Sequence, residues 1–345
     1  MHKPYLIDDL KFDLRVYVLL VGVNPLRAYI YKEGMARFAT EIYCSPNSTN
    51  LKNLYMHLTN YAINKNHEDY EDGDDHDGGH KRFMSGIFEH IEENEGKNNI
   101  WKEMKDIINK ALITVQPSLA HAYKTCRPHD TENSHCFEIL GFDIMIDHNL
   151  KPWLLEVNHS PSFHTDSDLD YDIKSSLITD TIKLLNLSSA RKSKYKRNKQ
   201  KDINERMMGK SRSAQSNVTE KQEKKNIAEK KRHKYEENNQ GNYEILFPSE
   251  SSDDNARYAK YSEEAMKIWE KFTGSYKTPA KVETPKVKKR LKKGSSTITA
   301  STRDTKKSST RLSLGQTAHS REKIGSTTRK MKKTPSAKLQ TEHKV

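Results

Sequence analysis

Residues 137–162 read FEILGFDIMIDHNLKPWLLEVNHSPS. Two apolar runs, 137–146 and 152–157, flank the polar connection 147–151. Asp and Asn in so short a connection are typical of a tight turn, because their side chains hydrogen-bond to the nearby backbone. Short apolar runs on both sides of a turn indicate strands. The stretch therefore predicts an antiparallel β-hairpin.

The second run carries polar residues that such a hairpin brings next to one another. Successive side chains of a strand point to opposite faces, so Glu156 and Asn158 share one face and Val157 points into the core. Asp143 lies on the partner strand, and cross-strand neighbours are only about 5 Å apart. Two carboxylates and an amide oxygen suit Mg²⁺, which completes its shell with water and phosphate. The alternative is the solvent face of an ordinary hairpin.

Upstream residues continue the pattern of packed strands and helices. Residues 12–20 alternate between apolar and other side chains, which is the period-2 signal of a strand. Residues 22–25 interrupt the alternation and 26–39 resume it, which predicts another hairpin. Apolar residues recur elsewhere at helical spacing. The helices predicted in this way cover 84–95, 100–126 and 173–187.

Charge divides the chain into two unlike parts. The whole chain has 345 residues and a net charge of +13. Residues 1–190 hold 19 Lys and Arg against 29 Asp and Glu, whereas residues 191–345 hold 41 against 18. The basic part predicts a polyanionic partner, because charge attracts its counter-charge over long distances. Nucleic acid is disfavoured as that partner, since Tyr195 and Tyr235 alone offer stacking in 191–240.

Composition predicts three segments. Residues 1–190 form an α+β domain that contains an acidic, solvated insertion at 67–80. Residues 191–274 form a basic helical segment that ends in a short structured return, with a strand at 243–248 and an apolar helix face in 258–272. Residues 275–345 are rich in Lys, Ser and Thr and lack apolar clusters, which predicts a disordered tail.

Cysteine usage and hydropathy limit the class of protein. Cys44, Cys126 and Cys136 form neither a paired set nor a CxxC motif, so reduced intracellular thiols are expected. No stretch approaches the roughly 20 apolar residues of a membrane span. Residues 1–20 lack the apolar core of a signal peptide. The sequence therefore predicts a protein of the cytoplasm with no membrane partner.

Four motifs carry a resemblance to a known family. They are KFDLRVY at 11–17, HLTNY at 57–61, the stretch 137–147, and KPWLLEVNHSPS at 151–162. In this order and spacing they resemble the tubulin tyrosine ligase-like family, and within it the polyglutamylase branch. The resemblance is close over residues 3–190. It continues more loosely to residue 275, where the polyglutamylases of that family carry a cationic microtubule-binding segment.

The resemblance implies an ATP-grasp fold, in which two lobes clasp ATP with Mg²⁺ between carboxylates and phosphates. It implies metal ligation by Asp143, Glu156 and Asn158, and roles in catalysis for Arg15 and Glu156. It also assigns contacts to the nucleotide and to an incoming glutamate. The nucleotide contacts are Lys11, Phe12, Asp13, Thr59 and Asn60, and the glutamate contacts are Arg37, Tyr61 and Lys81.

Several of these residues also have an ordinary structural interpretation. Arg15 and Asp13 share a strand face and could orient each other, or they could form a surface ion pair. Thr59 and Asn60 fit a helix cap or a turn. Such residue types are common, so they are specific to the family only in combination.

The implied reaction is an ATP- and Mg²⁺-dependent ligation. A γ-carboxylate in a tubulin C-terminal tail attacks the γ-phosphate of ATP, and the amine of free L-glutamate then displaces phosphate from the acyl phosphate. The expected partners are tubulin or microtubules and glutamate. The chain is expected to act as a monomer at the cytoskeleton, with the ciliary axoneme or basal body as candidate locations. Two alternatives stay open: an inactive microtubule-binding remnant of the fold, and a glycylase of the same family.

An ATP-grasp site draws on an earlier lobe for part of its nucleotide pocket. This chain begins at Met1-His2-Lys3-Pro4, in the middle of the catalytic core of the family it resembles. The expected fold is therefore an incomplete ATP-grasp core without its N-terminal lobe. Weak activity is expected of this chain alone.

Overall fold

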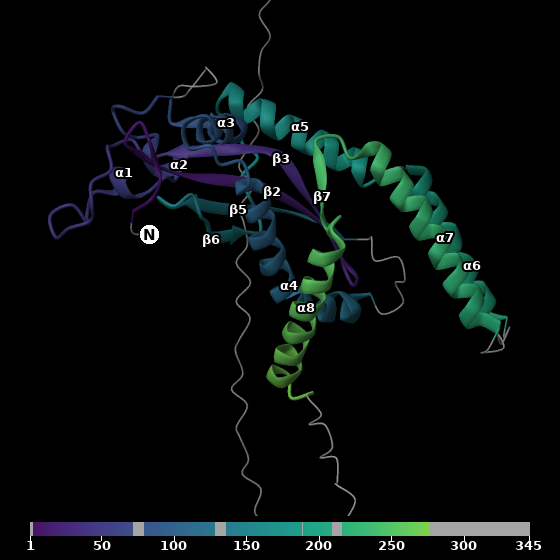
Figure 1. The fold of residues 1–345 in the computed structure, drawn as a ribbon. Helices are drawn as coiled ribbons and strands as arrows, with labels where there is room; N and C mark the ends of the chain where they lie inside the picture. Colours follow the sequence, from purple (N-terminus) through teal and green to yellow (C-terminus); the bar gives the residue numbers. More distant parts are fainter. Residues whose placement is uncertain (1–2, 72–78, 128–135, 188, 209–215, 276–345) are drawn as a thin grey trace, which may run out of the picture. The chain divides into compact units, whose positions relative to one another are not determined.

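The computed structural model describes residues 3–71, 79–127, 136–187, 189–208 and 216–275. Within them, seven antiparallel strands form one sheet in the order β4–β3–β2–β5–β6, with β1 paired to β2 and β7 paired to β3 (Figure 1). The long strand β2 therefore lies at the centre. The strands are β1 Leu6–Ile7, β2 Leu10–Val23, β3 Leu26–Phe38, β4 Lys81–Phe83, β5 Glu138–Ile146, β6 Pro152–Asn158 and β7 Tyr243–Phe247.

Both predicted hairpins are confirmed. β2 turns into β3 at Asn24–Pro25, and β5 turns into β6 through residues 147–151. In the second turn, the Oδ1 atom of Asp147 accepts the backbone N–H groups of Asn149 and Lys151 at 2.8 and 3.0 Å. These two local hydrogen bonds explain why an aspartate at the start of the connection indicated a turn.

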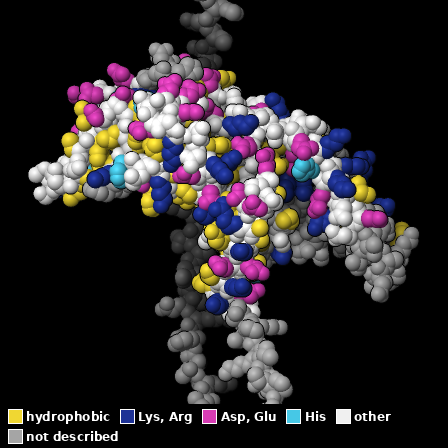
Figure 2. All heavy atoms as spheres, in the orientation of Figure 1, with side chains coloured by type: hydrophobic (Ala, Val, Ile, Leu, Met, Phe, Trp, Pro, Cys, Tyr) yellow, Lys and Arg dark blue, Asp and Glu magenta, His cyan; other side chains and the backbone are white. Residues whose placement is uncertain are grey.

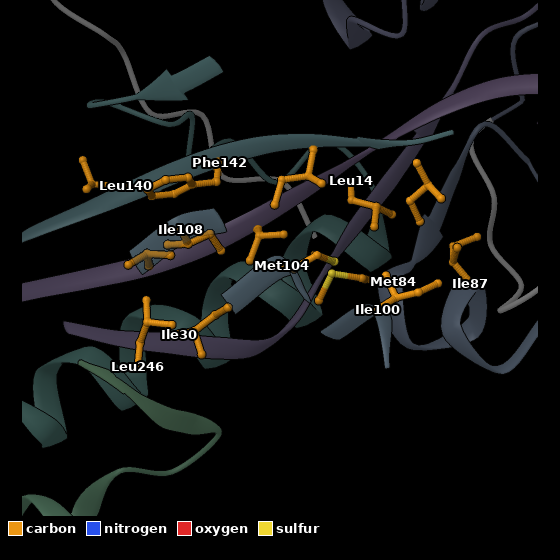
Figure 3. Close-up of a cluster of buried hydrophobic side chains, with 14 of the residues drawn as sticks. Leu14, Ile30, Met84, Ile87, Ile100, Met104, Ile108, Leu140, Phe142 and Leu246 are labelled. Atoms are coloured by element: carbon orange, nitrogen blue, oxygen red, sulfur yellow. The ribbon is translucent and has the colours of Figure 1, made fainter. Parts of the chain in front are cut away.

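One face of the sheet packs against helices α3 (Met84–Glu95), α4 (Ile100–Cys126) and α8 (Ser252–Phe272). α3 and α4 begin and end where helical spacing predicts. Figure 3 shows the resulting core, with Leu14 and Phe142 from the sheet near Met104 and Ile108 of α4. Burying each such side chain contributes about 1.5–3 kcal/mol, so this cluster holds the helices to the sheet.

The opposite face packs against α5 (Asp168–Leu184). Alternation along β2 places Tyr17 and Leu19 on this face, where Ile173 and Leu177 of α5 cover them. The helix begins before the predicted start at residue 173, because the side chain of Ser167 accepts the backbone N–H of Asp170 and caps an acidic first turn. A count of apolar residues cannot detect such a turn.

The basic stretch after residue 188 contains helices α6 (Ser189–Met207) and α7 (Ser216–Asn239). The C-terminal end of α7 is fixed to the sheet, since Glu236 contacts Arg27 at 2.5 Å and accepts the hydroxyl of Tyr29 at 2.9 Å. β7 follows as predicted. α8 starts at Ser252, earlier than its apolar face indicated, because Ser251 caps it. The predicted disordered tail lies outside the described residues from 276 onward.

Two short helices, α1 (Leu54–His57) and α2 (Tyr61–Asn64), lie between β3 and β4. Asn60 occupies the N-cap position of α2, although its side chain makes no capping bond. Residues 72–78 of the predicted acidic insertion lie outside the described part of the chain. No helix in the described ranges has the length and hydropathy that a bilayer crossing requires.

Val157 departs from its predicted burial. It lies opposite Phe142 and shares the core-facing side of that residue, but 45% of its surface is exposed. β6 is the last strand on its side of the sheet within the described residues, and Val157 is not part of the buried cluster that contains Phe142. Trp153 and Leu155 of β6 are exposed to a similar degree. The predicted orientation was right, but the predicted burial was wrong.

Candidate active site

Strand register brings the predicted charged residues together on the face that α5 covers farther along. In one row, Asp13 of β2 lies opposite Arg37 of β3, which lies opposite Lys81 of β4. In the next row, Arg15 of β2 lies opposite Asp143 of β5, which lies opposite Glu156 of β6. Asp13 and Arg15 are two residues apart, so both rows face the same side.

Ion pairs join the two rows. The guanidinium of Arg15 meets both carboxylate oxygens of Asp143, with Nε–Oδ1 and Nη2–Oδ2 distances of 2.5 and 3.0 Å. Arg37 donates to both oxygens of Asp13, and its Nη2 also lies 2.9 Å from Asp143 Oδ2. Their shared face suggested that Arg15 and Asp13 could pair with each other, but the structure shows no such pair. Each finds its partner on a neighbouring strand.

These charges are removed from water. Asp13, Asp143 and Arg37 expose 2%, 3% and 9% of their surfaces. Burial alone would raise the pKa of Asp143, but hydrogen bonds and charge from Arg15 and Arg37 outweigh it and hold that pKa below its ordinary value. Burial opposes the charge of Arg37, yet Asp13 and Asp143 raise its pKa. Asp143 is therefore a carboxylate at neutral pH.

A cavity of about 210 Å³ opens beside the two rows. Lys11 enters it with its Nζ bonded to the backbone oxygen of His57 at 2.6 Å, and burial lowers the pKa of this amine. The walls combine cations, carboxylates and apolar side chains. The lining residues are Lys11, Asp13, Arg37, His57, Leu58, Thr59, Asn60, Asp143, Met145, Leu155 and Glu156. The cavity thus gathers four of the five predicted nucleotide contacts beside two predicted metal ligands.

The fifth predicted nucleotide contact, Phe12, lies elsewhere. Its ring stacks on Phe38 with centroids 5.1 Å apart and belongs to the hydrophobic core. Alternation along β2 explains this, because Phe12 points to the face opposite Asp13. A contact from Phe12 to a nucleotide would therefore come from its backbone.

The predicted glutamate contacts Tyr61 and Lys81 meet each other. The ammonium of Lys81 lies 3.6 Å from the centroid of the Tyr61 ring. It also contacts Asp170 of α5 at 2.7 Å, and both residues of that pair are buried. No sequence pattern predicted a role for Asp170 or for its second partner, Lys174. The capping serine Ser167, three residues before Asp170, was the only local signal for this position.

The predicted metal ligands converge around one amide. Asn158 Nδ2 lies 3.3 Å from Asp143 Oδ2 and 3.1 Å from Glu156 Oε1. Rotating this amide by half a turn would present its oxygen beside the two carboxylates, which is the oxygen donor set that Mg²⁺ prefers. The three residues therefore fit this ion. Among the described residues, no group of three His, Cys, Asp or Glu side chains forms another candidate metal site.

Two glycines let the backbone approach closely around Arg15. A Cβ atom at Gly34 would overlap the backbone oxygen of Arg15 and would lie 3.3 Å from the sulfur of Met84. A Cβ atom at Gly141 would lie 3.1 Å from the Arg15 side chain and 3.2 Å from Pro161. The glycines at positions 34 and 141 thus leave the space that Arg15 occupies between the two neighbouring strands.

Residues 1–194 match the family model described as the tubulin-tyrosine ligase family. The chain belongs to this family. The match covers all the candidate site residues, and it confirms the resemblance that the four motifs carried. It also agrees with the mixed helical and antiparallel architecture of the structure.

Similar members of the tubulin-tyrosine ligase family include proteins named as polyglutamylases. A "Probable beta-tubulin polyglutamylase" of Tetrahymena thermophila is 43% identical over 279 residues, which is 80% of this chain and 23% of that protein. "Tubulin polyglutamylase ttll6" of Danio rerio is 40% identical over 80% of this chain and 35% of its own length. "Tubulin polyglutamylase TTLL6" of Homo sapiens is 41% identical over 79% and 30%. The chain therefore spans about a quarter to a third of these relatives.

Proposed function

We infer that this chain carries catalytic residues of a tubulin polyglutamylase, which ligates glutamate to glutamate side chains in tubulin tails. The observation that supports this most directly is the convergence of Asp143, Glu156 and Asn158 beside a cavity that holds Lys11 and Arg37. The names of the relatives point to the same substrate. We propose an ATP-grasp fold as its architecture.

Mg²⁺ and ATP, when bound, would supply the phosphoryl group and the charge that stabilises its transfer. Asp143, Glu156 and Asn158 would hold the metal through their oxygens. Lys11 would contact the nucleotide from its position on the cavity wall, with Asp13, Thr59 and Asn60 beside it. Arg15 would add positive charge next to the phosphates while it orients Asp143.

The amino-acid side of the site would be cationic. Arg37 uses Nε and Nη2 to contact Asp13 and Asp143. Its third guanidinium nitrogen, Nη1, has no contact to Asp13 or Asp143 and could donate to a carboxylate of free glutamate. Bidentate binding of the glutamate carboxylate by Arg37 would require Arg37 to break its contact with Asp13. A single bond from Arg37, assisted by Lys81 and Tyr61, fits the geometry better. The held glutamate would then present its amine to the activated tail carboxylate.

The tubulin-facing surface would be the basic helix α6. Lys192, Lys196 and Arg197 on this helix are exposed, and Figure 2 shows Lys and Arg side chains gathered over α6 and α7. Tubulin tails are acidic, so these residues would attract and retain them. We therefore propose microtubules as the surface on which the enzyme acts.

The proposal is tested by incubating the purified chain with microtubules, Mg-ATP and isotopically labelled glutamate. We expect weak, ATP-dependent incorporation into tubulin tails, detected by mass spectrometry, and no incorporation by the Glu156→Gln variant. Labelled glycine serves as the competing donor. Microtubule binding without any incorporation would support an inactive remnant, and preference for glycine would support a glycylase; either result would overturn the proposal.

A further inference from the structure

A buried carboxylate at the start of α5 joins three segments around the amino-acid side of the site. Asp170 exposes 2% of its surface. Its Oδ2 atom lies 2.7 Å from the ammonium of Lys81 on β4, and its Oδ1 atom lies 2.6 Å from the ammonium of Lys174, one helical turn later. Ser167 completes the arrangement, with its hydroxyl 3.3 Å from Asp170 Oδ2.

The contact with Lys81 fixes that side chain next to the proposed substrate position. Lys81 lies opposite Arg37 in the strand register. Its ammonium is held between the carboxylate of Asp170 and the ring of Tyr61. A lysine side chain is flexible by nature, and two opposite partners remove that freedom.

The contact with Lys174 reaches the segment that follows the metal ligands. Lys174 donates to the backbone oxygen of His164. His164 lies in the connection 159–167, between Asn158 at the end of β6 and the cap of α5. Asp170 therefore holds this connection indirectly, because it orients the lysine that binds it.

The charges favour a specific class of ligand. Two ammonium groups share one carboxylate in a buried cluster, and one of them, that of Lys81, lies opposite Arg37 in the strand register. Burial alone would raise the pKa of Asp170, but the hydrogen bonds from Lys174 and Lys81 hold it below its ordinary value, so it stays ionised. Ammonium and guanidinium groups gathered in this way are suited to bind a carboxylate of an incoming amino acid.

We propose that Asp170 is a positioning residue for amino-acid binding: it holds Lys81 and, through Lys174, the connection 159–167 in the arrangement that receives the amino-acid carboxylate. This inference rests on the proposed function. It assigns no direct substrate contact to Asp170. It predicts that a change at Asp170 affects the amino acid and leaves the nucleotide site intact.

The kinetic test compares Asp170→Asn with Asp172→Asn, an exposed aspartate on the same helix. We expect Asp170→Asn to raise the KM for glutamate by about tenfold or more, as loss of a charged hydrogen bond implies. The KM for ATP should stay at the wild-type value, and Asp172→Asn should behave as wild type. Asp170→Glu keeps the charge and should recover part of the affinity. Equal changes in both KM values, or no change in either, would overturn the proposal.

A second measurement does not depend on catalysis. Hydrogen exchange should increase in residues 159–167 of Asp170→Asn, and Lys81 should become more reactive in acetylation footprinting read by mass spectrometry. Lys174→Met keeps the pair of Asp170 with Lys81, so it should increase exchange in 159–167 without exposing Lys81. If wild type fails to ligate glutamate, the proposed function fails, and these measurements still decide the positioning role. Unchanged exchange and labelling would refute it.

Discussion

Arg15 and Asp143 lie directly opposite each other on β2 and β5, and two guanidinium nitrogens meet the two carboxylate oxygens at 2.5 and 3.0 Å. Asp143 also contacts Arg37 at 2.9 Å, so a single carboxylate connects strands β5, β2 and β3. Removing one member of a buried ion pair typically costs about 3–5 kcal/mol, because the other charge is left uncompensated. Substitution of Asp143 would therefore disturb both folding and chemistry, whereas Glu156 offers a cleaner test.

Glu156→Gln should abolish ligation and leave the fold intact. Glutamine keeps the size of the side chain but lacks the charge that Mg²⁺ requires, so we expect the rate of glutamate incorporation to fall by at least about 100-fold. Glu156 is exposed, so the melting temperature should change by less than about 2 °C. The control is Glu138→Gln, an exposed glutamate on β5. Full activity in Glu156→Gln would remove Glu156 from the proposed metal site.

Arg37→Lys should weaken glutamate binding more than ATP binding. Lysine keeps the positive charge but cannot hold Asp13 and Asp143 and still offer a further donor in a fixed plane. We expect the KM for glutamate to rise by about tenfold and the KM for ATP to change by less than about twofold. Steady-state kinetics with each substrate varied in turn checks this. Arg82→Lys, on β4 and paired with Asp8, is the matched control. Parallel weakening of both substrates would indicate that Arg37 only supports the structure.

Reversing the charges of Lys192, Lys196 and Arg197 to Glu should weaken binding to microtubules. Exposed charges are screened over about 8 Å at physiological salt, so wild-type binding should also fall steeply as salt is raised. Co-sedimentation at several salt concentrations measures both effects. The control reverses three exposed lysines of α8, which are Lys260, Lys267 and Lys271. If the affinity of the wild-type chain for microtubules does not change with salt concentration, the interface is apolar and the proposed basic surface is wrong.

Glu244 should make stability depend on pH. It accepts hydrogen bonds from Trp101, at 3.1 Å, and from Lys105 of α4. Burial raises its pKa, but these hydrogen bonds and the charge of Lys105 and Lys32 hold the pKa below its ordinary value. The ionised group therefore stabilises the fold above the unfolded-state pKa of about 4.3, and this contribution is lost as the pH falls through the lower folded-state pKa.

Glu244→Gln should accordingly reduce the free energy of unfolding at pH 7 by about 1 kcal/mol. The difference from wild type should shrink below a pH of about 4. Urea denaturation at a series of pH values checks this, with Glu264→Gln on the exposed side of α8 as the control. A difference that stays constant with pH would show that the ionisation of Glu244 does not stabilise the fold.

Val157→Lys should increase the soluble yield of the chain. β6 ends the described sheet with an unpaired edge and exposed Trp153, Leu155 and Val157, and such an edge invites pairing between molecules. A lysine on an edge strand opposes that pairing. Light scattering during concentration checks this against Val115→Lys, whose site on α4 is 47% exposed but lies off the sheet edge. Equal improvement by both variants would point to general hydropathy and not to the strand edge.

Local patterns predicted the parts of the fold that local forces decide. The alternation along β2 and the helical spacing of α4 each report which side chains face the core, and both elements appear where expected. The turn at Asp147 was equally predictable, because its hydrogen bonds reach only two and four residues along the chain. The family motifs added the candidate site residues, which strand register then brings into two adjacent rows.

Other features depend on contacts between distant segments. The exposure of Val157 follows from its place at the sheet edge, which alternation alone does not show. The partners of Asp13 and Arg15 follow from the register of β2 against β3 and β5, which no pattern within β2 encodes. Asp170 meets Lys81 across 89 positions of sequence, so its role emerges only when α5 packs on the sheet. Sequence predicted the faces correctly, while the pairings required the structure.

Gly34 offers a criterion for judging relatives of this chain. Because a Cβ atom there would overlap the backbone of Arg15, any other residue at this position would displace Arg15 and, with it, the carboxylate of Asp143. A homologue could thus keep every charged residue of the site and still be inactive through one extra methyl group. When genomes are screened for functional members, the residue aligned with Gly34 should be inspected together with the charged positions. A glycine there indicates that the strands carrying these charges can still approach each other closely.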